Sequence, residues 1–231
     1  KALETIDAAA KGDDATLQDT ATRLLGEWMT ADAAPVLLGL AKNPASKYQG
    51  RALRGYIRIA RQFDMPNSQR VEMCQKALEA ADRSEDKKLV LLVLERYPSP
   101  EMLKMAVKAA EDPALQEEAN RAALVSIRKL GDQGSNVREL MSEAGLSPVK
   151  VEIVKAEYGA GTMQKDVTQA LQKQVCELPL ITLPAKSYNK SFGGDPAPGS
   201  TKKLVVEYRI DGKVSNASFQ EDATIMLPMP K

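Results

Sequence analysis

The sequence of 231 residues contains no histidine, two cysteines and few aromatic residues: one Trp, six Tyr and three Phe. Without histidine it cannot form a Ser-His-Asp or Cys-His nucleophile system, a His-dependent zinc site, or the commonest general base near neutral pH. Cys74 and Cys176 are far apart in the sequence and form no CxxC pattern, so a structural zinc site is not expected either. The composition therefore predicts no metal, no cofactor and no histidine-dependent catalysis.

Long apolar runs and a charge of one sign are also missing. No stretch approaches the roughly 18 consecutive apolar residues that predict a membrane span. The 32 basic and 31 acidic side chains give a net charge of +1, and neither part of the chain has the strong positive charge typical of nonspecific nucleic-acid binding. We expect a globular protein with no membrane span and no nucleic-acid partner, since 43% of the residues are hydrophobic and can form a core.

Two further features concern the origin of the chain. The sequence begins with Lys1 rather than methionine, so we expect a processed or excised part of a longer protein. The positions of Cys74 and Cys176 favour two free thiols over a disulfide, and this does not determine the compartment.

Apolar residues recur three and four positions apart through the first two thirds of the sequence, which is the spacing of helix faces. The breaks between these runs carry Gly, Pro, Asn or Asp. Ser99-Pro100 and Asp112-Pro113 each place a capping residue before a proline at the first helical position, and Asp14 or Thr16 can cap another helix. The pattern predicts helices over residues 2–11, 14–29, 31–42, 47–63, 68–81, 84–97, 100–111, 113–130 and 136–144.

Short helices with short connections favour antiparallel pairs, which here form an irregular repeat. Asn43-Pro44-Ala45 precedes Arg51-Ala52-Leu53, and Asp112-Pro113-Ala114 precedes Arg121-Ala122-Ala123-Leu124. These segments resemble the HEAT-like (armadillo-type) helical repeat family over about residues 1–146. The resemblance implies an α-α superhelix of helical hairpins, an architecture whose extended surface suits binding rather than catalysis.

After Gly145 the pattern changes to alternation of apolar and polar residues, which is typical of strands. Asp211-Gly212 favours the type I′ turn of a hairpin, and residues 166–175 fit a short helix without excluding a strand. The predicted extended runs are residues 149–158, 178–183, 203–210, 214–219 and 224–227. We expect an α+β multidomain chain, with a helical repeat domain at residues 1–146 and a small, mainly antiparallel β domain at residues 147–231.

Six short segments of the second part carry a further resemblance: Glu157-Tyr158-Gly159, Asp166-Val167-Thr168, Asp195-Pro196, Gly199, Lys202-Lys203-Leu204 and Tyr208. In this order they resemble the C-terminal domain of unknown function of a DnaJ-like J-protein family, over about residues 150–228. The resemblance implies a fold but no assigned chemistry. Co-chaperone activity does not transfer, because a J domain needs a His-Pro-Asp tripeptide.

The whole chain is also similar to repeat-containing regions of large exported bacterial proteins that carry carbohydrate-active domains elsewhere. This similarity implies a bacterial origin and slightly favours an exported or periplasmic location over a cytoplasmic one.

A row of basic residues occupies one face of the predicted helix 47–63: Lys47, Arg51, Arg54, Arg58 and Arg61. One interpretation is a docking surface for an acidic protein segment, a phosphate or a carboxylated glycan, with bidentate guanidinium contacts. The other is structural: the arginines pair with acids of neighbouring helices, such as Glu72, Glu79, Glu85 and Glu95, or cover a solvated face. The structural interpretation is the commoner outcome for such a row.

The loop 192–199 is rich in glycine and proline but lacks the spacing of a nucleotide-binding loop. We expect a stiff structural connection, with exposed Tyr188 and Phe192 as its contacts if it binds a ligand. The adjacent acids Glu117-Glu118 and Asp13-Asp14 lie at predicted helix starts, where negative charge is stabilising. They are therefore weak candidates for a two-carboxylate hydrolase site.

Together these features predict a non-catalytic interaction or scaffold module, whose helical surface binds a protein partner or another acidic ligand. One alternative is an accessory region of a larger exported carbohydrate-active enzyme, which would present substrate or space domains and meet carbohydrate through an adjoining domain. A third, weaker alternative is a hydrolase that uses carboxylates alone. We expect no catalytic residue and no enzyme activity in this chain.

Overall fold

The structure is a computed structural model that describes residues 1–228. Contacts within the chain divide it into two compact units, and the boundary in the sequence falls between Leu130 and Gly131. The first unit is helical and the second contains an antiparallel sheet, which gives the predicted α+β layout. The sequence places the domain boundary later, at residue 146, and that boundary stays a prediction.

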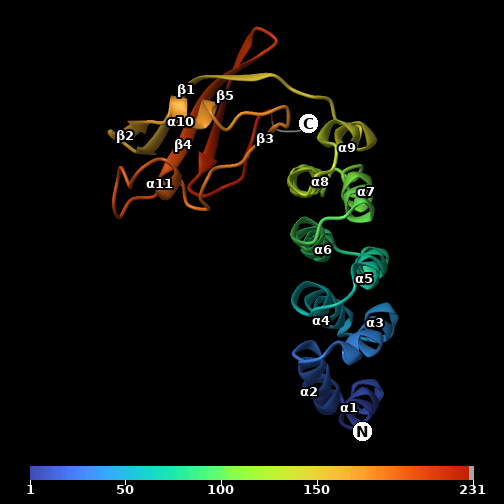
Figure 1. The fold of residues 1–231 in the computed structure, drawn as a ribbon. Helices are drawn as coiled ribbons and strands as arrows, with labels where there is room; N and C mark the ends of the chain where they lie inside the picture. Colours follow the sequence, from blue (N-terminus) through green and yellow to red (C-terminus); the bar gives the residue numbers. More distant parts are fainter. Residues whose placement is uncertain (229–231) are drawn as a thin grey trace. The chain divides into compact units, whose positions relative to one another are not determined.

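The helices of the first unit follow the predicted spans closely and lie in two rows, with α2, α4, α6 and α8 in one and α1, α3, α5 and α7 in the other (Figure 1). Helix α4 packs against α3 and also against α2 and α6 of its own row. Their bounds are α1 Ala2–Lys11, α2 Ala15–Gly26, η1 Ala31–Ala33, α3 Ala34–Lys42, α4 Gln49–Gln62, α5 Asn67–Ala80, α6 Ser84–Arg96, α7 Pro100–Ala109 and α8 Gln116–Asp132.

Side-chain caps start two of these helices where the sequence predicts them. The Asp14 carboxylate accepts hydrogen bonds from the backbone N–H groups that open α2, and Ser99 Oγ accepts one at 3.2 Å from Met102 N–H in α7. Asp112, the third predicted cap, does not cap a helix. Its carboxylate accepts a hydrogen bond from Ala114 N–H and closes a turn. Helix α8 consequently begins at Gln116 rather than at residue 113.

The second unit is built on a four-stranded antiparallel sheet in the order β2-β1-β4-β5, with a separate pair of short strands, β3 and β6. The positive φ angles of Asp211 and Gly212, 49° and 79°, confirm the predicted hairpin turn between β4 and β5. Strand β2 is not predicted, because its four residues are all exposed and do not alternate. The bounds are α9 Val137–Glu143, β1 Val151–Ala160, β2 Met163–Asp166, α10 Thr168–Gln172, β3 Leu180–Ile181, α11 Tyr188–Ser191, β4 Lys203–Ile210, β5 Lys213–Gln220 and β6 Ile225–Met226.

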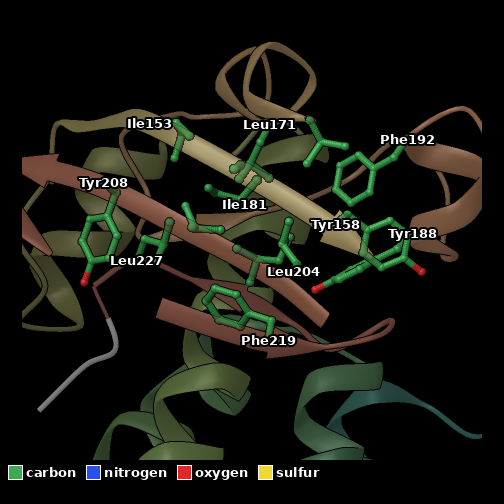
Figure 2. Close-up of a cluster of buried hydrophobic side chains, with 14 of the residues drawn as sticks. Ile153, Tyr158, Leu171, Ile181, Tyr188, Phe192, Leu204, Tyr208, Phe219 and Leu227 are labelled. Carbon is green, nitrogen blue, oxygen red and sulfur yellow. The ribbon is translucent and has the colours of Figure 1, made fainter. Parts of the chain in front are cut away.

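Alternation along the strands gives the sheet one buried face. In β4, Leu204 and Val206 are fully buried, whereas Val205 between them is 44% exposed. Figure 2 shows Leu204 among the core side chains, together with aromatic rings from β1, β4 and β5 and apolar side chains from the segments that cover the sheet. The buried face therefore forms the core of the second unit.

The two faces of β4 should respond differently to the same truncation. We expect Leu204→Ala to lower the free energy of unfolding by about 2–5 kcal/mol, because it leaves a cavity in a closed core. The matched variant Val205→Ala should cost less than about 0.5 kcal/mol. Urea denaturation followed by circular dichroism measures both, and equal losses would contradict the assignment of the faces.

Candidate functional site: an arginine-lined groove

Helices α2 and α4 border an open groove of about 370 Å³, which we call the arginine groove. It is lined by Arg23, Gly26, Glu27, Arg51, Arg54, Gly55 and Arg58. Three of the five basic residues predicted as a row on α4 thus line it. Arg23 lies in α2 and Glu27 directly follows it. Neither could be predicted as part of the row, because helical spacing relates residues within one helix and not across two.

A glycine on α4, Gly55, allows the two helices to approach closely at this groove. A Cβ atom at Gly55 would lie 3.0 Å from the Cα of Gly26 and 3.1 Å from the Leu37 side chain. The first contact is with backbone, so a larger residue would push α2 and α4 apart. The close approach places the arginines of α4 within reach of polar groups of α2.

Asp19 of α2 binds two of these arginines. Its Oδ1 lies 2.8 Å from Arg51 Nη1, which also donates to Thr22 Oγ1 at 2.9 Å, and its Oδ2 accepts from Arg23 Nη2. The hydrogen bond from Arg51, with the nearby charge of Arg23, holds the pKa of the Asp19 carboxyl below its usual value. One carboxylate is therefore shared between two guanidinium groups.

The other two arginines have different partners. Arg54 Nε donates to Asp86 Oδ1 at 2.7 Å, and the Asp86 side chain is only 3% exposed in the first turn of α6. Arg58 Nε donates to the Gly26 carbonyl at 2.7 Å, and Arg58 Nη2 donates to the Trp28 carbonyl. Arg58 thus satisfies carbonyls at the C-terminal end of α2, which ends at Gly26 rather than at the predicted residue 29.

The arginines of the row therefore have structural partners. These partners are not the four glutamates that the sequence suggested. Within the described residues, Glu72 pairs with Lys76, Glu85 with Lys88, and Glu95 with Arg121. The carboxylates that hold the row are Asp19 and Asp86. The remaining members of the row, Lys47 and Arg61, do not line the groove: Lys47 Nζ lies 5.0 Å from the Tyr48 ring centroid, and Arg61 is exposed.

The groove nevertheless retains positive charge and unused donors. Arg58 is hydrogen-bonded only to neutral acceptors in residues 1–228: two carbonyls and the Gln62 side chain. Arg54 is half exposed, and its two Nη groups make no hydrogen bond to any described residue. Arg23 is 66% exposed and shares Asp19 with Arg51. An anion entering the groove would meet guanidinium groups that are already positioned.

The expectation that Tyr188 and Phe192 are exposed is wrong. Their exposed fractions are 2% and 4%, and their rings pack on Tyr158 with centroid distances of 5.6 and 5.4 Å (Figure 2). The Tyr188 hydroxyl donates to the Ala223 carbonyl at 2.6 Å. Both rings belong to the core, because α11 turns them inward over the sheet.

Three of the segments that resemble the J-protein domain contribute a residue, Tyr158, Asp195 or Lys202, to a polar cluster around Glu221. Lys202 Nζ, whose side chain is 5% exposed, lies 3.3 Å from Asp195 and 3.2 Å from Glu221. Glu221 also accepts a hydrogen bond from the Tyr158 hydroxyl at 2.9 Å. The pKa of Tyr158 is raised, mainly by burial and also by this hydrogen bond. Lys202 thus binds two carboxylates, and its contact with Asp195 ties loop 192–199 to the start of β4.

Other chemistry-bearing groups have simple environments. Burial raises the pKa of the Cys74 thiol to about 12, which makes it a poor nucleophile, and no disulfide joins it to Cys176.

Among residues 1–228 no three His, Cys, Asp or Glu side chains are grouped as metal ligands would be. Across the same residues, every helix is too short or too polar to cross a bilayer. Asp14 and Glu118 cap or open helices, and Glu118 also binds Lys88 at 2.7 Å.

Comparisons with protein families, curated proteins and solved structures found no match to this chain. The resemblances to HEAT-like repeats and to the J-protein domain therefore stay predictions. The groove must be interpreted from its own geometry and charge.

The contacts predict that two groove arginines differ in their effect on stability. Arg58→Met keeps the aliphatic stem but loses the bonds to two carbonyls, so we expect the free energy of unfolding to fall by about 1–2 kcal/mol. Arg23→Met removes one exposed pair within a helix turn and should leave stability unchanged. Chemical denaturation of both variants measures this difference, and an unaltered midpoint for Arg58→Met would show that its carbonyl contacts contribute nothing.

Proposed function

We propose that the chain is a non-catalytic binding module whose arginine groove takes an acidic segment of a protein partner. The observation that carries this proposal is the half-exposed Arg54: Asp86 holds its Nε, and its two Nη groups have no partner in the described residues. A guanidinium fixed at one nitrogen and open at two others is ready for a bidentate carboxylate contact.

The shape of the groove supports an extended acidic segment rather than a single small anion. Arg51, Arg54 and Arg58 follow one another along α4 over seven residues, a rise of about 10 Å. Three residues of an extended peptide cover the same length. Two or three neighbouring Asp or Glu side chains could therefore meet successive arginines, with Arg23 on the opposite wall.

The helical unit supports the broader role of an interaction scaffold. Two rows of short helices, with α4 packed on both row neighbours, are compatible with the proposed superhelix of HEAT-like hairpins. In such an architecture the helices of one row share an extended surface. The proposed groove lies between two successive helices of one row.

The alternative of a carbohydrate-presenting region would meet carbohydrate through an adjoining domain. The rings of Tyr188 and Phe192, named as ligand contacts of loop 192–199, lie in the core and offer a glycan no surface. No contact of the described residues favours a glycan over a carboxylate-rich peptide, so we retain the protein partner as the proposal.

Binding to a labelled peptide of eight glutamates tests the proposed function. We expect saturable binding that weakens with added salt, because the groove contacts are between charges. Arg23→Met should reduce affinity about 5–10-fold, or about 1 kcal/mol, through the loss of one exposed charged contact. Fluorescence anisotropy provides the measurement.

The control is Arg209→Met, which removes the same charge from an arginine that also pairs with one carboxylate, Glu152 at 2.8 Å, in the second unit. This variant should bind like the parent protein. Equal losses for Arg23→Met and Arg209→Met would mean that the peptide senses only overall charge, which would refute the groove as the site.

The proposal also predicts how binding depends on pH. Every charged group of the groove is an arginine or a carboxylate, and the chain has no histidine. Affinity should therefore stay constant within about twofold between roughly pH 6 and 9, where neither type titrates. A tenfold change within this range, measured by the same anisotropy assay, would require a titrating group outside the groove.

Asp19 sets the expected behaviour in acid. Its pKa is lower in the folded protein than in the unfolded chain, so its pairing with Arg51 stabilises the fold above the unfolded pKa. This stabilisation is lost as the pH falls through the lower, folded value. Binding assays should therefore be kept above this range.

A further inference from the structure

The two edges of the four-stranded sheet differ in length and charge. Edge strand β2 has four residues, Met163–Asp166, of which the last two are charged. Edge strand β5 has eight, Lys213–Gln220, and the six residues from Val214 to Phe219 carry no charge. Short length and charged side chains are the usual protection of an edge, so β2 is protected and β5 is not.

Strand β5 is also regular and accessible. Its pairing with β4 runs from Lys213 to Gln220 without a register shift, whereas a bulge interrupts the pairing of β1 with β4. It contains no proline, and Val214 is 51% exposed. The edge therefore has neither the bulge nor the proline that would prevent a further strand from pairing.

The backbone groups on the outer side of β5 are largely unused. A strand with one neighbour directs about half of its N–H and C=O groups away from that neighbour. In residues 1–228, the backbone of β5 makes one hydrogen bond outside its ladder with β4, from Ala223 N–H to the Gln220 carbonyl. A row of donors and acceptors thus remains along the exposed edge.

We propose that this edge pairs antiparallel with β5 of a second copy of the chain, which joins two four-stranded sheets into one of eight strands. A twofold axis perpendicular to the sheet makes the two edges complementary to each other. With the axis at Ala217, the exposed Asn216 of one copy faces Ser218 of the other. The single charge of the strand, on Lys213, lies at opposite ends of the antiparallel ladder, whereas parallel pairing would place the two lysines together.

Sedimentation equilibrium over about 5–500 μM tests the proposal on the full chain. We expect the weight-average mass to rise with concentration from 25.1 kDa towards twice that value. Hydrogen exchange of the same samples should show protection of the β5 amides increasing at least threefold with concentration. A mass that stays at the monomer value up to 500 μM overturns the proposal.

Two charge-matched double variants identify the surface. Asn216→Lys with Ser218→Lys adds two positive charges to the β5 edge, where they oppose each other across the dimer axis, and should weaken association at least tenfold. Val205→Lys with Glu207→Gln makes the same charge change on β4, at the positions directly opposite those two residues on the same face. This control should still dimerise. Association that is lost in the control, or kept in the β5 variant, would place the contact elsewhere and overturn the proposal.

Discussion

The close approach of α2 and α4 at Gly26 and Gly55 is the constraint on which the candidate site depends. Because a side chain at Gly55 would collide with the backbone of α2, the absence of one lets Arg58 reach the carbonyl groups that end α2. The same approach places Arg51 on Asp19. The arginines therefore hold the two helices together and, in doing so, are fixed in the positions in which they line the groove.

Structural and binding roles are thus not exclusive in this row of arginines. Each guanidinium has several N–H donors and can satisfy a neighbouring helix with some of them while presenting others to a ligand. Arg58 contributes mainly to structure, since its bonds go to the end of α2. Arg54 divides its donors between Asp86 and the groove, and Arg23 is mostly exposed.

Much of the fold could be predicted from the sequence, because it depends on local patterns. Apolar spacing gives helices, alternation gives β4 and β5, and Asp211-Gly212 gives their turn. Strand β2 could not be predicted, since its exposed residues have no alternation and it forms only by pairing with β1. Likewise, the burial of Tyr188 and Phe192 depends on how α11 folds over the sheet, which spacing along the chain does not encode.

The candidate site was half predictable for the same reason. The row on α4 is visible in the sequence, but its partners Asp19 and Asp86 come from two other helices.

The most direct test of the proposed site is a titration of the arginine Nε–H NMR signals with the octaglutamate peptide. We predict saturable shifts of the Arg54 and Arg23 signals, with the signal of Arg209 in the second unit unmoved. Uniform small shifts across all arginines, or saturable shifts confined to the second unit, would contradict it.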